Sequence, residues 1–316
     1  MNDVDVIIPV HGTPIFLFDT LQSIGGQSNI NKIIIVLDRV DKEYFSKLNV
    51  LQDNLIVVTS NTPGIVSALN TGLQISKADY IARIDSDDMM HPGRIDKQRD
   101  FLVSNPMCVC VGSNLEIFDE ISVRKIKKYP NSHRKIIKQL TYQNAIAHPS
   151  VMFRRKAVLE AGCYRPLFEG SEDYDLWFRL SKIGDLNNIN FPLTKYRISS
   201  GQYSSKFSTY RVELDSFVRL LNLADIKEFP TLNYDKLVPG PEIQKYYRSF
   251  LSLVKEDNKK LYNDLKNAEK FSVLLNYRSF QIISKFDHIV FLFLVLRLIL
   301  MSPKFSLKVI FGKIIT

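Results

Sequence analysis

The sequence predicts an α/β fold in which helices cover a doubly wound sheet. Short apolar runs with the length of buried strands occur at residues 4–10, 32–37, 55–58 and 80–84. Segments with helical spacing follow the first three of these runs, at residues 15–24, 41–49 and 64–76. Strands that alternate with helices form parallel βαβ units, and the ligands of such sheets bind beyond the carboxyl ends of the strands.

The composition is that of a globular protein, since 45% of the 316 residues are hydrophobic and 24% are charged. The net charge of +9 favours anionic partners. No nucleic-acid-binding motif is present, so we expect lipid or nucleotide as partner and no nucleic acid. The three cysteines do not suit a disulfide framework, and Cys108 and Cys110 alternate with valines in a predicted buried strand. The N-terminus lacks the pattern of a signal peptide, which predicts a cytoplasmic protein.

The loop after the first predicted strand does not match the common nucleotide-binding motifs. It reads Val-His-Gly-Thr-Pro over residues 10–14, and the chain contains neither G-x-G-x-x-G at this place nor a G-x-x-x-x-G-K-[ST] loop. A dinucleotide fold of the dehydrogenase type is therefore disfavoured.

Three carboxylates follow the fourth predicted strand, namely Asp85, Asp87 and Asp88. Like charges this close repel one another, so the cluster costs stability unless a cation neutralises it. Oxygen ligands at the end of a strand suit Mg²⁺ or Mn²⁺, which commonly bridge nucleotide phosphates. The alternative is a solvated acidic loop. Asp38 follows the second predicted strand, so we expect it at the same crevice as Asp85.

A second acidic group lies at a predicted helix start, in the run Glu-Gly-Ser-Glu-Asp-Tyr-Asp-Leu-Trp of residues 169–177. Ser171 is suited to cap this helix, and the acids of the first turn favourably meet the helix dipole. That reading is purely structural. A carboxylate partly desolvated by the neighbouring Trp177 is alternatively suited to act as a general base. His148 opens a further predicted strand at residues 147–153, and Arg197 lies on a predicted mobile loop where it could meet a diphosphate.

The C-terminal third of the chain has a different character. Residues 204–285 are polar with stretches of helical spacing, which predicts a helical extension. Residues 286–316 mix lysines with large apolar side chains, and the apolar run 289–301 is too short to span a bilayer. We expect this segment to associate with an anionic membrane surface. A buried helix that completes the core is the alternative.

Taken in order, these motifs resemble the inverting glycosyltransferases of family 2, over roughly residues 4–200. The resemblance depends on the following stretches: Val-Ile-Ile-Pro-Val, Asp38, Asn61 with Gly64 and Asn70, Tyr-Ile-Ala-Arg-Ile-Asp-Ser-Asp-Asp, His-Pro-Ser-Val-Met-Phe and Ser-Glu-Asp-Tyr-Asp-Leu-Trp. It implies the nucleotide-diphospho-sugar (GT-A) fold with a mixed sheet. The catalytic domain is then residues 1–203, with a nucleotide-sugar half up to about residue 100 and an acceptor half after it.

The resemblance also implies roles for individual residues. Asp173 is the expected general base, and Glu172 orients the site or contacts the acceptor. Asp87 is the expected ligand of Mn²⁺ or Mg²⁺, with Asp85 in the metal shell or against the ribose. The remaining nucleotide-binding residues are expected to be Pro9, Val10, His11, Asp38, Gly64, Asn70 and Arg83. The residues expected around the acceptor or the diphosphate are His148, Trp177 and Arg197.

The activity implied is a single displacement that moves a sugar from a nucleotide-diphospho-sugar, with UDP favoured, to a saccharide acceptor. With the basic C-terminus, a lipid-linked acceptor of O-antigen or capsule synthesis at the inner membrane face is expected. Two departures are present: Ser199 replaces a histidine found in many relatives, and the Gln-x-x-Arg-Trp motif of processive synthases is absent, which favours a single addition. A nucleotidyltransferase on a related fold and a non-catalytic carbohydrate- or lipid-binding protein are the alternatives.

Overall fold

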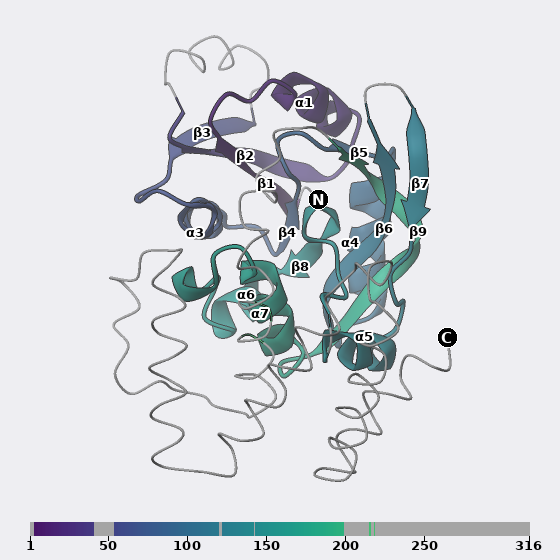
Figure 1. The fold of residues 1–316 in the computed structure, drawn as a ribbon. Helices are drawn as coiled ribbons and strands as arrows, with labels where there is room; N and C mark the ends of the chain where they lie inside the picture. The colour runs from purple at the N-terminus through teal and green to yellow at the C-terminus, as the bar shows by residue number, and fades with distance from the viewer. Residues whose placement is uncertain are drawn as a thin grey trace, which may run out of the picture. The chain divides into compact units, whose positions relative to one another are not determined.

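The computed structural model describes residues 3–40, 54–119, 122–141, 143–198, 215 and 218, all within the first of two units of the chain, Met1–Glu242. One mixed sheet of nine strands organises this part (Figure 1). Its strands follow the order β3-β2-β1-β4-β8-β6-β9-β5, and β7 pairs with β6 off this path. The doubly wound mixed sheet expected from the sequence is confirmed.

The first half of the sheet is parallel and lies in the N-terminal part of the chain. Its four strands are β1 (Val4–His11), β2 (Ile30–Asp38), β3 (Leu55–Thr59) and β4 (Tyr80–Arg83). Helices α1 (Leu17–Gly25) and α3 (Ile65–Ile75) connect them. Seven of the eight residues of β1 are buried. Strands β2 and β4 pair with its two edges, and such inner parallel strands are covered on both faces. The four predicted strands and two of the predicted helices are confirmed to within one or two residues at their ends, with α1 starting at residue 17 rather than 15 and β2 at residue 30 rather than 32.

The second half introduces the antiparallel pairs. Strand β8 is antiparallel to both β4 and β6, whereas β6 and β9 run parallel over their length. The strands of this half are β5 (Met89–Met90), β6 (Cys108–Phe118), β7 (Val123–Lys127), β8 (Met152–Arg154) and β9 (Asp185–Arg197). Its helices are α4 (Arg94–Ser104), α5 (His133–Leu140), η1 (His148–Ser150), α6 (Arg155–Glu160), η2 (Pro166–Phe168) and α7 (Glu172–Leu180).

A fully buried arginine ties the two halves together. Arg94 is 0% exposed, and its guanidinium donates to the carbonyls of Arg83 at 2.8 Å and Pro149 at 2.9 Å and to the hydroxyl of Thr194 at 2.9 Å. A buried charge is tolerated only when its donors are satisfied. These bonds fix the end of β4 against η1 and β9, which positions the loop after β4.

One predicted strand needs correction, and several predicted segments lie outside the described residues. The strand predicted at residues 147–153 is a 3₁₀ helix, His148–Ser150, followed by the short strand β8. Pro149 has no N–H for a strand ladder and its fixed φ suits the first turn of a helix. The helix predicted at 41–49, Ser199, and the C-terminal segments 204–285 and 286–316 lie outside the described residues, apart from 215 and 218. Among the described helices, none is long and apolar enough to cross a membrane.

Candidate functional site

The carboxyl ends of β1 and β2 bring His11 and Asp38 together. The two residues pair in the ladder, and His11 Nδ1 lies 2.9 Å from Asp38 Oδ2. The other carboxylate oxygen, Asp38 Oδ1, is buried and has no hydrogen-bond partner in the described part of the chain, with Arg39 Nε 3.8 Å away. An unsatisfied buried acceptor at a strand end is suited to receive an N–H of a ligand.

The loop after β1 begins later than the sequence suggested. Pro9 and Val10 are strand residues paired with Val36 and Leu37, and both are buried. Their side chains therefore belong to the core, so they offer a nucleoside only backbone atoms, which corrects the expectation of loop contacts. Only His11, at the end of β1, is partly exposed.

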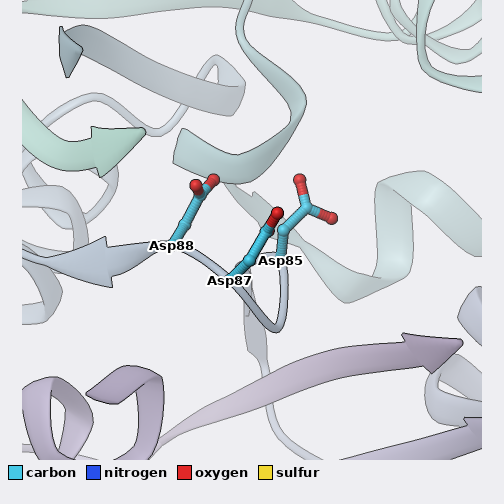
Figure 2. A group of neighbouring side chains, drawn as sticks. All are labelled: Asp85, Asp87 and Asp88. Atoms are coloured by element: carbon cyan, nitrogen blue, oxygen red, sulfur yellow. The ribbon is translucent and has the colours of Figure 1, made fainter. Parts of the chain in front are cut away.

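The three carboxylates after β4 form one cluster. Asp85, Asp87 and Asp88 leave a single loop with their carboxylates close together (Figure 2), and one oxygen of each lies within 4.8 Å of the others. Asp85 accepts two hydrogen bonds from the Arg83 guanidinium, the one from Nη1 at 2.9 Å. Asp88 is 0% exposed, and Asp88 Oδ2 has no hydrogen-bond partner among the described residues.

Burial and mutual repulsion perturb these acids. Burial, followed by the charge of Asp85, raises the pKa of Asp87 to about 6. The same two causes, with the charge of Asp87, raise the pKa of Asp88 well above its usual range. Three neighbouring carboxylates, of which Asp87 and Asp88 have raised pKa values and Asp88 has an unpaired oxygen among the described residues, fit a divalent cation such as Mg²⁺ or Mn²⁺.

Arg197 closes one side of this cluster from a strand rather than from a loop. It is the last residue of β9 and only 6% exposed. Its backbone N–H donates to Asp88 Oδ1 and its Nε to the carbonyl of Asp87, both at 2.9 Å, while its guanidinium lies 4.7 Å from the Phe118 ring centroid. The prediction of a mobile loop is wrong here, because the long β6–β9 ladder continues through Arg197.

The second acidic group lies in the first turn of α7, as expected. Asp173 is 6% exposed, and its oxygens accept from Asn144 Nδ2 at 2.6 Å and from the backbone N–H of Tyr174 at 2.7 Å. Ser171 occupies the position before the helix but makes no capping bond, and its hydroxyl donates to Asp215 at 2.5 Å. Ser171 therefore lies at the predicted N-cap position but does not make the predicted capping hydrogen bond.

Glu172 of the same group is equally buried and makes two contacts. Its Oε2 accepts from the Gly170 N–H at 2.7 Å, and its Oε1 lies 3.6 Å from His148 Nδ1. His148 Nε2 in turn lies 3.0 Å from the Tyr164 hydroxyl. Burial, followed by the charge of Asp173, raises the pKa of Glu172 to about 7. This carboxyl therefore titrates near neutral pH, as acid–base residues commonly do.

Trp177 does not line the site. Its side chain is 0% exposed and packs edge-on to His148 with ring centroids 5.9 Å apart. The expectation of contact with an acceptor is wrong, because every residue of α7 except Arg179 is buried and the Trp177 side chain has no exposed surface. In the described part of the chain, Trp177 packs against the site at His148.

Arg83 connects the two acidic groups. It is 2% exposed on β4; burial opposes its charge, but the carboxylates of Asp85, Glu172 and Asp88 outweigh burial and raise the pKa of Arg83. The charge of Arg83 is thus favoured by acids of both groups, and its guanidinium binds Asp85 directly. The role in nucleotide binding that the sequence suggested for Arg83 stays a prediction.

The start of α3 meets a carboxylate as well. Gly64 has a φ of 116°, and a Cβ added there would lie 2.5 Å from Glu169 Oε2. Asn70 uses its amide on the backbone of Tyr164, accepting at 3.0 Å and donating at 2.8 Å. Gly64 therefore allows the close approach of Glu169, and Asn70 holds the backbone of Tyr164. The role of both residues in nucleotide binding stays a prediction.

Sequence reasoning missed several residues that shape the site. Asn144 holds Asp173, and Arg165 and Arg179 both bind the fully buried Asp175 of α7. Asp88 was noted in the cluster but given no role. The available signal for Asn144 was its place just upstream of the His-Pro-Ser stretch.

Comparisons with known proteins agree with this arrangement. Residues 5–162 match the family model for glycosyl transferase family 2. The O-antigen biosynthesis glycosyltransferase WbnJ of Escherichia coli is 32% identical over 207 residues, which cover 63% of this chain and 80% of WbnJ. The UDP-Gal:alpha-D-GlcNAc-diphosphoundecaprenol beta-1,3-galactosyltransferase of Escherichia coli is 30% identical over 200 residues, 61% of this chain and 72% of that enzyme.

Solved structures share the fold at low sequence identity. The 1–349 fragment of TarS from S. aureus, in complex with UDP-GlcNAc, superposes with a TM-score of 0.58 at 13% identity, covering 89% of this chain and 95% of the fragment. The chain covers 54% of a longer TarS structure. With half of its length matched by the family model and its acids at the ends of β2 and β4 and the start of α7, the chain belongs to glycosyl transferase family 2 and is a glycosyltransferase.

Proposed function

We propose that this glycosyltransferase moves a sugar from a UDP-sugar to a saccharide carried on a lipid diphosphate, with inversion at the anomeric carbon and with the help of Mn²⁺ or Mg²⁺. The observation that carries the proposal is the presence of two acidic groups, the cluster of Asp85, Asp87 and Asp88 after β4 and the acids in the first turn of α7. One group is suited to hold a nucleotide diphosphate through a cation, and the other to take a proton from an acceptor.

The donor half of the proposal depends on β2 and β4. Asp38 Oδ1, buried without a partner among the described residues, accepts an N–H of the nucleotide base. Asp87 and Asp88 would hold the cation, with Asp85 oriented by Arg83. When bound, the cation supplies positive charge that offsets the charge developing on the leaving diphosphate. A UDP donor is supported by the names of the galactosyltransferase and the TarS complex, which mention UDP-Gal and UDP-GlcNAc.

The acceptor half depends on the start of α7. Asp173 takes the proton of the acceptor hydroxyl as that oxygen bonds to the anomeric carbon, and the bond from this carbon to the diphosphate breaks. Asn144 fixes the rotamer of Asp173 through its bond to Oδ2. Each carboxylate oxygen has two lone pairs, so Asp173 keeps capacity to accept the proton after these bonds are made.

The names of two relatives support the proposed acceptor. WbnJ is named for O-antigen biosynthesis, and the galactosyltransferase for an acceptor on diphosphoundecaprenol. We therefore propose a single sugar addition to a lipid-linked acceptor of surface-polysaccharide synthesis, at the cytoplasmic face of the membrane. The metal, the inversion and the peripheral attachment are parts of this proposal.

The test uses purified full-length protein, a panel of nucleotide sugars and a lipid-diphosphate acceptor, with products identified by mass spectrometry and the anomeric configuration by NMR. Asp173→Asn keeps the shape of the base but accepts no proton, so we expect UDP binding to be retained and the transfer rate to fall by roughly 10²-fold or more. The matched control is Asp100→Asn, an exposed acid on α4. Transfer by the Asp173 variant at the wild-type rate would make this aspartate structural. Conversion of the nucleotide sugar and added pyrophosphate into a nucleoside triphosphate and a sugar 1-phosphate would instead support a nucleotidyltransferase, and binding without turnover a non-catalytic protein.

A further inference from the structure

Strand β7 and the segment after it form a basic strip on the described part of the chain. Residues 122–138 hold seven Lys and Arg and no Asp or Glu, against 42 Lys and Arg in all 316 residues, which is about three times the average density. Every residue from 122 to 128 is exposed, and so are Arg134, Lys135 and Lys138 on α5. We call residues 122–138 the basic strip. It follows the right-hand side of the view in Figure 1, from β7 down to α5.

Two large apolar side chains lie among these cations. Val123 is 56% exposed and Ile126 is 42% exposed. Strand β7 has a β-bulge at Arg124, so Val123 pairs with Phe118 and Ile126 with Glu116. Because Phe118 and Glu116 are two residues apart on β6, Val123 and Ile126 project from the same face of β7, each flanked by Lys or Arg. Strand β7 pairs with β6 along one edge, and no other strand pairs with it among the described residues. Lysines on an edge strand commonly prevent aggregation, but the basic strip continues onto α5, where no strand edge needs protection.

The basic strip begins beside the catalytic site. Strand β6 ends at Phe118, opposite both Val123 of β7 and Arg197 of β9. The Phe118 ring lies 4.7 Å from the Arg197 guanidinium, whose Nε donates to the carbonyl of Asp87. A surface that binds the strip therefore lies next to the cluster after β4.

From this placement we infer that the basic strip docks the protein on an anionic lipid bilayer, with its cations on the headgroups and Val123 and Ile126 at the acyl boundary. Cations interspersed with exposed apolar residues match the chemistry of such a surface, where phosphate lies above hydrocarbon. A soluble polyanion would bind the cations alone and gain nothing from the two apolar side chains. This inference rests on the proposed function, whose peripheral attachment it assigns to one surface, and it is tested without donor or acceptor.

The experiment measures binding of the full-length protein to vesicles of phosphatidylglycerol and phosphatidylcholine by sedimentation. Each Lys near an anionic surface contributes about fivefold to partitioning, so Lys125→Glu with Lys128→Glu is expected to lower it by about 25-fold or more. The matched control is Lys77→Glu with Lys156→Glu, which makes the same change of charge at exposed positions after α3 and on α6, away from β7 in Figure 1. The control is expected to lower partitioning by less than about threefold.

A second variant separates a bilayer from a soluble polyanion. Val123→Ser with Ile126→Ser leaves every charge in place and is expected to weaken vesicle binding severalfold while leaving retention on heparin unchanged. Equal losses in the charge variant and its control would overturn the inference, since general attraction of a basic protein would explain both. Unchanged vesicle binding with new aggregation of the charge variant would overturn it in favour of edge protection. Transfer to a water-soluble acceptor analogue is expected to stay at the wild-type rate in all of these variants, so failure here is distinguishable from failure of the proposed function.

Discussion

The carboxyl group of Glu172 gives the sharpest test of the site, because its environment opposes its charge. It is 6% exposed and adjacent to Asp173, and its pKa is raised from 4.5 to about 7 by burial and by the Asp173 charge. Below about pH 4.5 the carboxyl is protonated in both the folded and the unfolded chain. Between about pH 4.5 and pH 7 the unfolded chain releases the proton while the folded chain keeps it, so the free energy of unfolding falls as the pH rises.

The size of this effect follows from the shift. About 2.5 pKa units at 1.36 kcal/mol each amount to about 3 kcal/mol lost by pH 8. Glu172→Gln removes the charge but can still accept the Gly170 N–H, so the variant avoids this loss. We expect the free energies of unfolding of the variant and the wild type to agree near pH 4 and the variant to be more stable by about 3 kcal/mol at pH 8. For a domain of this size that corresponds to about 6 to 12 °C in melting temperature.

The assay is thermal unfolding of the two proteins, followed by circular dichroism across this pH range. Asp175→Asn is the matched control on the same helix: Asp175 is fully buried too, but Arg179 and Arg165 overcome burial and lower its pKa. Breaking this buried pair is expected to cost about 3 to 5 kcal/mol at pH 8, the opposite sign. If Glu172→Gln were less stable than the wild type at pH 8, or gained equally at pH 4, the reasoning about burial and charge at α7 would be refuted.

Three further outcomes follow from the site. Asp87→Ala is expected to remove both turnover and the rise in melting temperature that Mn²⁺ gives the wild type, and full activity of the wild type in excess chelator would contradict the metal. Asp38→Ala is expected to raise the KM for the nucleotide sugar about tenfold or more with little change in kcat, as loss of a hydrogen bond to a charged group would; an unchanged KM would remove Asp38 from base recognition. Gly64→Ala is expected to lower the free energy of unfolding by about 1 to 3 kcal/mol, since its φ is 116° and a Cβ would meet Glu169. Gly26→Ala is its control, because nothing lies within 4 Å of a Cβ at Gly26, and equal melting temperatures of the two variants would contradict the strain.

Much of the fold was predictable because burial leaves a local record. The runs that became β1 to β4 are apolar on both faces, and only strands covered on both sides tolerate that pattern. The start of the antiparallel strand β8 was not predictable in the same way, because the 3₁₀ turn that contains Pro149 precedes it within residues 147–153. Asp38 is the last residue of β2 and Asp85 follows the end of β4, as expected from the general position of ligands in such sheets. That the two acids share one crevice stays a prediction.

The sequence by itself determined the alternation of strands and helices, the family and the acids available for chemistry, since these depend on residue types and on spacing along the chain. Only the tertiary structure decided which side chains meet. Asn144 reaches Asp173 across 29 positions, and Arg197 reaches the Asp87 carbonyl across 110. Such contacts depend on the strand order of the mixed sheet, which pairs β9 with β5, the strand directly after the acidic loop, and on the packing of η1 next to β4. Likewise, the burial of Trp177 and the raised pKa of Glu172 come from what packs against α7, and no local pattern encodes those neighbours.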